Sequence, residues 1–123
     1  MEKTRIVLIE NDEIIAQDIK DILEKNNYEV LAVLKSGTDA ISAIRALKPD
    51  VAIFDVHLQN QMDGVDAVKI LNSFISLPVL FITGYTDEKT LDKIHQVTVS
   101  SYLLKPFKEQ ELTAKIQEIL KNH

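Results

Sequence analysis

Short apolar runs alternate along the chain with longer stretches in which apolar residues recur every three or four positions. The short runs have the length of strands and show no polar alternation, so we expect strands that are buried on both faces of a sheet. They predict strands over 6–9, 29–34, 51–54, 79–82 and 101–104.

Helical spacing of apolar residues fills the stretches that follow these strands. It predicts helices over 13–26, from the turn at 36–39 to Pro49, over 65–74 and over 86–96, and a last helix that carries Leu112, Ile116 and Ile119 on one face. Residues suited to a helix N-terminus open the second and the fourth of these helices, and Pro49 stops the second.

Strands and helices in strict alternation favour a parallel sheet with helices on both sides and right-handed connections. The 123 residues are about half of what a closed eight-unit barrel needs. We therefore predict an α/β fold, the flavodoxin-like (βα)5 doubly wound five-stranded parallel sheet with strand order 2-1-3-4-5. No linker rich in Pro, Gly or Ser divides the sequence, so we expect a single domain over 1–123 with no separate output domain.

Composition narrows the possible functions. Hydrophobic residues make up 46% of the chain, enough for a packed core, and the absence of Cys excludes disulfides, thiolate zinc sites and a Cys nucleophile. The three histidines, His57, His95 and His123, are too scattered for a metal cluster.

A net charge of −5 disfavours direct binding to nucleic acid or to an anionic membrane. No apolar run is long enough to span a membrane and no signal peptide opens the chain, so we expect a cytoplasmic protein.

Polar residues follow the predicted strands at the edge of the sheet where chemistry is expected. Glu10-Asn11-Asp12-Glu13 follow the first strand, Asp55 the third, Thr83 the fourth and Lys105 the fifth. In the expected strand order Asp12 and Asp55 converge, and their repulsion calls for a cation. Carboxylate, carbonyl and water oxygens are the ligands that Mg²⁺ prefers, so this edge predicts a magnesium site.

Each of these residues alone has an ordinary structural interpretation. Asp12 and Thr83 could cap helices, and Lys105 could lie on the surface. Asp55 is harder to explain in that way, because it follows four apolar residues and a buried unpaired carboxylate is costly. The gathering of all four residues at one edge favours a functional site.

At these residues the sequence resembles the receiver (response-regulator) domain of two-component phosphorelay signalling. The resemblance extends from Ile6 to about Leu120 and is specific through the order and spacing of its segments. The strongest segments are Pro49-Asp50-Val51-Ala52-Ile53-Phe54-Asp55, Met62-Asp63-Gly64, 81–88 and Tyr102-Leu103-Leu104-Lys105-Pro106-Phe107.

The resemblance implies that Asp55 accepts a phosphoryl group from a histidine kinase or a phosphotransfer protein. It implies that Asp12 binds Mg²⁺ directly and that the backbone carbonyl of His57 completes the metal site. The family usually has two acids after the first strand, and here Asn11 replaces the first of them. We expect Asn11 to lie next to the residues that bind the metal, or to contact the metal through a bridging water. We also expect the site to bind Mg²⁺ more weakly. Glu10 could partly compensate for the missing charge at longer range, although the sequence leaves open which way its side chain points.

The resemblance also implies the parts of a switch. Thr83 contacts the phosphoryl group, Lys105 pairs with it, the Lys105-Pro106 bond is cis, and Tyr102 changes rotamer on activation. The surface that switches comprises the helix over 86–96, the strand over 101–104 and the last helix. It would bind an unknown downstream protein, and the chain is expected to be a monomer or a weak dimer through that surface.

We therefore expect a phosphoacceptor whose only catalysis is Mg²⁺-dependent self-phosphorylation and autodephosphorylation. A receiver fragment of a larger regulator or hybrid kinase stays open, as does a pseudo-receiver that binds a partner without phosphorylation, which Asn11 favours. A haloacid-dehalogenase-type phosphatase would need an Asp where His57 stands. A flavodoxin-like cofactor binder would need a phosphate loop in place of the acidic residues 10–13.

Overall fold

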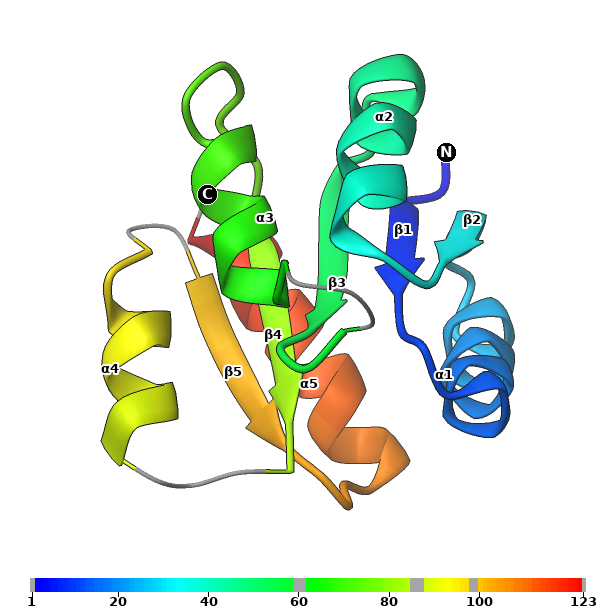
Figure 1. The fold of residues 1–123 in the computed structure, drawn as a ribbon. Helices are drawn as coiled ribbons and strands as arrows, with labels where there is room; N and C mark the ends of the chain where they lie inside the picture. Colours follow the sequence, from blue (N-terminus) through cyan, green and yellow to red (C-terminus); the bar gives the residue numbers. More distant parts are fainter. Residues whose placement is uncertain (1, 59–61, 85–87, 98–99, 123) are drawn as a thin grey trace.

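The computed structural model describes residues 2–58, 62–84, 88–97 and 100–122. Strands and helices alternate along the chain (Figure 1). They are β1 (Arg5–Ile9), α1 (Glu13–Lys25), β2 (Glu29–Leu34), α2 (Gly37–Leu47), β3 (Val51–Asp55), α3 (Gly64–Leu71), β4 (Val79–Thr83), α4 (Glu88–His95), β5 (Ser100–Leu104) and α5 (Glu109–Lys121). In the described part of the chain, no helix has the length and apolar character needed to cross a membrane.

The five strands form one parallel sheet in the order β2-β1-β3-β4-β5, which confirms the predicted topology. Helices α1 and α5 cover one face of the sheet, and α2, α3 and α4 cover the other (Figure 1). Because side chains alternate along a strand, β1 sends Ile6 and Leu8 to the first face and Val7 and Ile9 to the second.

Burial follows the position of each strand in the sheet. Every residue of β3 and β4 is buried, as the continuous apolar runs predicted. The same prediction is wrong for β2, where all six residues keep some exposure and Val33 is 39% exposed. This strand lies at the edge of the sheet, so only one neighbouring strand covers it.

Two helix boundaries differ from the predicted ones. Helix α3 ends at Leu71 and not at Phe74, because the chain turns there with hydrogen bonds from Ser73 N to Ile70 O and from Phe74 N to Leu71 O. The Phe74 ring is half exposed, with the Arg45 guanidinium 5.0 Å from its centre. The described part of α4 begins at Glu88, and the predicted start at 86–87 lies outside the described residues.

Gly64 opens α3 in direct contact with the end of β3. Its N–H donates to the carbonyl of Val56 at 2.8 Å, and a Cβ atom at this position would lie 2.3 Å from the backbone oxygen of Asp55. Real Cβ atoms do not approach oxygen so closely, so the backbone of β3 and the N-terminus of α3 fit together only with glycine.

We predict that Gly64→Ala destabilises the fold by about 1–3 kcal/mol, because a methyl group forced into a packed backbone displaces the N-terminus of α3. Urea unfolding followed by circular dichroism measures this. Gly84→Ala is the matched control, since a Cβ there meets nothing within 4 Å, and its effect should stay below about 0.5 kcal/mol. Equal stability of the two variants would contradict the close contact.

Candidate functional site

Three charged side chains meet at the carboxyl end of the sheet. The ammonium of Lys105, just after β5, lies 2.7 Å from Glu10 Oε1 and 3.4 Å from Asp55 Oδ2. The side chains of Glu10 and Asp55 are only 1% and 7% exposed, and that of Lys105 is 22% exposed. Two almost completely buried carboxylates therefore share one ammonium.

This sharing shifts the pKa values of the group. Burial, reinforced by a hydrogen bond with Asp55, raises the pKa of Glu10 to about 7 although Lys105 opposes the shift. Burial would lower the pKa of Lys105, but its hydrogen bond to Glu10 and the charge of Asp55 outweigh burial and raise it. The ammonium thus stays charged, and the cluster of Glu10, Asp55 and Lys105 has negative charge in excess when both carboxylates are ionised.

The register of the sheet explains why Glu10 meets Asp55. Ile9 of β1 pairs with Phe54 of β3, so the next residues of the two strands, Glu10 and Asp55, come side by side. Glu10 follows four fully buried apolar residues, as Asp55 does. That shared signal in the sequence could have identified Glu10 as the partner of Asp55.

Asp12 lies two residues further along and has other contacts. Its side chain is the N-cap of α1, where Oδ1 accepts hydrogen bonds from the N–H groups of Ile14 at 2.9 Å and Ile15 at 3.1 Å. Its own N–H donates to Glu10 Oε2 at 3.3 Å. The structure places Glu10 beside Asp55, while the expected convergence of Asp12 with Asp55 and direct metal ligation by Asp12 stay predictions.

The donor set of the cluster suits Mg²⁺, which usually takes one or two carboxylates and completes its shell with neutral oxygens. Glu10 and Asp55 supply two buried carboxylates whose charge Lys105 only partly compensates. Among the described residues, no three acidic or histidine side chains gather around a common point. Besides the predicted Asp12, neutral oxygens such as the amide of Asn11, the carbonyl of His57 and water would complete the set of ligands.

The other predicted residues border this cluster. The His57 N–H donates to Asp55 Oδ1 at 3.0 Å. Thr83 is completely buried at the end of β4, and its carbonyl accepts the Lys105 N–H at 2.8 Å. The Lys105–Pro106 peptide bond is cis, the isomer that the resemblance implies.

Thr83 and Tyr102 belong to the side of the sheet that α4 covers. Tyr102 pairs with Phe81, and both pack in the core under α2, α3 and α4. Thr83 comes two residues after Phe81, so strand alternation gives it the same side. The Tyr102 ring meets the ring of His95 on α4 edge to face, with 6.5 Å between ring centres.

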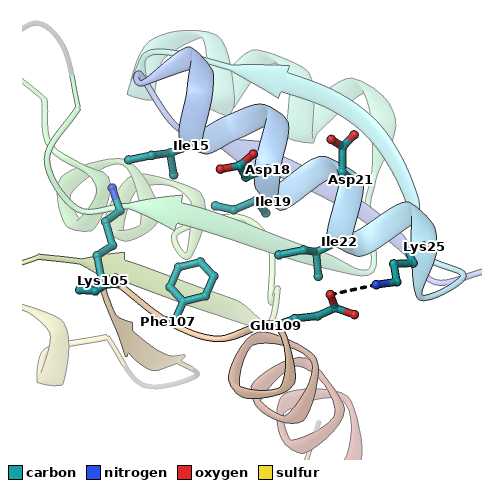
Figure 2. A pocket seen from close by; sticks show the side chains of 10 residues that line it. Ile15, Asp18, Ile19, Asp21, Ile22, Lys25, Lys105, Phe107 and Glu109 are labelled. Carbon is teal, nitrogen blue, oxygen red and sulfur yellow. Dashed lines mark hydrogen bonds and ion pairs between the residues drawn. The ribbon is translucent and has the colours of Figure 1, made fainter.

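A groove of about 720 Å³ runs from Lys105 along α1. Figure 2 shows Lys105 at one end and the ion pair between Lys25 and Glu109 at the other. The groove is lined by apolar Ile15, Ile19, Ile22 and Phe107 and by acidic Asp18 and Asp21. It is a mostly apolar surface with an acidic border that leads to the cluster.

Comparison with known proteins gives the family. The sequence model of the response regulator receiver domain matches residues 6–117. The DNA-binding response regulator MtrA of Mycobacterium tuberculosis is 28% identical over 121 residues, and the transcriptional regulatory protein YvrH of Bacillus subtilis is 29% identical over 121 residues. Both matches cover 98% of this chain but only 52% and 51% of those proteins, so the chain spans about half the length of these relatives.

Solved structures agree over the whole chain. The signal receiver domain of a modulated diguanylate cyclase from Desulfovibrio desulfuricans G20 matches with a TM-score of 0.90 and 28% identity, covering 98% of this chain and 96% of that one. A putative response regulator from Chloroflexus aurantiacus J-10-fl matches with a TM-score of 0.90 and 28% identity, covering 98% and 99%. With the family match over residues 6–117, these similarities show that the chain belongs to the response regulator receiver domains of two-component signalling.

Proposed function

We propose that in this chain Asp55 accepts the phosphoryl group, since receiver domains act as phosphoacceptors in two-component systems. The observation that carries this proposal is the buried Asp55 carboxylate at the end of β3, 3.4 Å from the ammonium of Lys105. A carboxylate in this position is a nucleophile with a fixed positive charge beside it.

In this phosphoryl transfer, the nucleophile is the only group of the protein that forms a covalent bond. One carboxylate oxygen of Asp55 attacks the phosphorus of a phosphohistidine. A P–O bond forms, the P–N bond breaks, and the donor imidazole leaves with the electron pair of that bond and takes up a proton. Positioning and electrostatics supply most of the rate in such transfers. Lys105 neutralises the transferred oxygens and the Thr83 hydroxyl donates to one of them. Attack by water on the acyl phosphate then releases phosphate and restores Asp55.

Mg²⁺, when bound, would supply further positive charge for the phosphoryl oxygens. The residues that we propose for it are Asp55, Glu10, the carbonyl of His57 and, through water, Asn11. Asp12 stays in the proposal because the resemblance implies it, although its Oδ1 caps α1. Asn in place of an acid at residue 11 removes one negative charge, so this site should bind the metal more weakly than one with three acids.

The phosphoryl group adds charge and acceptor oxygens at Asp55. We propose that Thr83 turns toward it and that Tyr102 fills the space that Thr83 leaves, which changes the surface of α4, β5 and α5. The output is then a changed partner surface for a downstream protein, with the chain a monomer or a weak dimer through that surface. A stand-alone domain in the cytoplasm and a part of a longer regulator both fit this mechanism, and the length of the native reading frame distinguishes them.

The groove along α1 begins at Lys105, whose ammonium lies 3.4 Å from Asp55. Its apolar lining and the acidic border of Asp18 and Asp21 suit a helix with apolar and basic residues. We propose that a histidine kinase or a phosphotransfer protein docks with such a helix.

Asp55→Asn should abolish labelling by acetyl phosphate with Mg²⁺, because an amide cannot form the acyl phosphate. Intact-protein mass spectrometry detects the added phosphoryl group. Asp50→Asn is the matched control: Asp50 precedes the same strand at its other end, where it accepts the Arg5 N–H at 2.8 Å. A label that survives in Asp55→Asn would identify another acceptor, and no label on the wild-type protein would favour the pseudo-receiver.

Asn11→Asp should tighten Mg²⁺ binding by about tenfold or more, since it adds a negative charge close to the cation. Glu10→Gln should weaken it by a similar factor. Isothermal titration calorimetry measures both affinities.

Asp12→Asn tests the remaining carboxylate in the same experiment, because Asn preserves the cap on α1 while removing the charge. Weaker binding in this variant would support direct ligation by Asp12. Unchanged affinity would assign the site to Glu10 and Asp55.

Ile15→Glu should slow phosphotransfer from a phosphorylated histidine kinase that labels the wild-type chain by about tenfold or more, because a charge replaces part of the apolar docking surface. Labelling by acetyl phosphate should not change, since that donor needs no groove. Ile70→Glu on α3, where Ile70 is 43% exposed outside the groove, is the control. Equal slowing by both variants would contradict docking along α1.

A further inference from the structure

Two lysine contacts join the α3 segment to α4 and to Gln96, the residue that follows α4. The ammonium of Lys93 on α4 forms an ion pair with Asp63 and lies 3.6 Å from Asp66 Oδ1. The side chains of Lys93 and Asp63 are only 31% and 27% exposed. One turn further along, the ammonium of Lys69 on α3 donates to the side-chain oxygen of Gln96.

Asp63 connects the contact with Lys93 to β3, the strand that ends at Asp55. It is the N-cap of α3, with Oδ1 accepting the Asp66 N–H at 2.8 Å while Oδ2 binds Lys93. Burial would raise the pKa of Asp63, but the hydrogen bonds from Lys93 and from the Asp66 backbone outweigh it and lower the pKa. The next residue, Gly64, rests on the backbone of Asp55 without room for a Cβ atom. A continuous series of contacts thus runs from Asp55 through Gly64 and Asp63 to α4.

The rest of α4 is lightly anchored. This helix has eight residues and buries only Thr90 and Ile94, whereas α3 has the same length and buries five. An element with little buried apolar surface opens at low free-energy cost, so a partly buried ion pair contributes a large share of what holds it. Lys93 is therefore well placed to control the position of α4.

We propose that Lys93, Asp63 and Asp66 form a latch, the α3–α4 latch, that fixes α4 to the N-terminus of α3 while Asp55 is unmodified and lets it go when Asp55 is phosphorylated. The second half rests on the proposed function. A phosphoryl group on Asp55 adds charge and volume at the end of β3, and Gly64 transmits any shift of that backbone to Asp63. Because coupling is reciprocal, the latch also opposes phosphorylation.

Hydrogen exchange of the unmodified full chain tests the first half. Amides 89–95 of Lys93→Met should exchange about tenfold faster than in the wild-type protein, and those of α5 should not change. Lys89→Met is the matched control, because Lys89 is an exposed lysine of the same helix and enters none of the ion pairs described. Equal exchange of α4 in the two variants would overturn the latch.

Asp63→Asn gives a second variant should Lys93→Met lose its fold, which loss of protection in α5 would reveal. Asn keeps the cap of α3 and removes the charge that binds Lys93. It should release α4 by the same factor, and wild-type protection of α4 in this variant would also overturn the latch.

Labelling with acetyl phosphate and Mg²⁺ tests the second half. In the labelled wild-type protein, the exchange rate of the α4 amides should rise toward the rate in unmodified Lys93→Met. In Lys93→Met itself, labelling should raise that rate by less than about twofold. Labelled Asp55 with unchanged α4 protection would overturn release by phosphorylation while supporting the phosphoacceptor role. A chain that takes up no label would contradict the proposed function, and the comparison of unmodified variants would still decide whether the latch exists.

Discussion

One ammonium shared by two buried carboxylates is the central constraint on this molecule. Glu10 and Asp55 are almost excluded from water, and burial of unpaired charge is costly. Lys105 offsets part of that cost, and it can reach both carboxylates only because β1, β3 and β5 end at the same edge of one parallel sheet. The closer contact, to Glu10 at 2.7 Å, leaves Asp55 with a charged neighbour at 3.4 Å and without a tight ion pair. This arrangement suits the proposed role of Asp55 as a nucleophile, because a strong ion pair would have to be broken before attack.

The sheet register sets this arrangement, and apolar packing sets the register. A shift of one residue between β1 and β3 would exchange the sides of the sheet to which their side chains point. Both strands are fully buried at 6–9 and 51–54, so such a shift would disrupt two cores at once. The geometry of the charged cluster is thus specified by residues that take no part in its chemistry.

The sequence alone predicts the parallel sheet and its strand order, because continuous apolar runs and helical spacing are strong signals. It also predicts Asp55 as a member of a charged cluster, since a carboxylate after four buried residues needs a partner. It could not tell that Glu10 lies beside Asp55, because an acid after a strand can equally be read as a helix cap, and the pairing of Ile9 with Phe54 is what brings Glu10 there. The end of α3 was missed because Phe74 continues the apolar spacing, while its ring lies half exposed beside Arg45. The contact of Lys93 with Asp63 joins residues 30 positions apart and leaves no local pattern.

The cation that partly compensates the two carboxylates, Lys105, belongs to the chain itself. Some proteins balance their buried charges only with a bound ion. Such proteins fold when the ion binds and unfold when it is removed. Here Lys105 lies 2.7 Å from Glu10 and 3.4 Å from Asp55 as part of the folded chain, so a positive charge stands beside both carboxylates without a bound ion. The proposed magnesium site would then add to an arrangement of charges that the fold already holds.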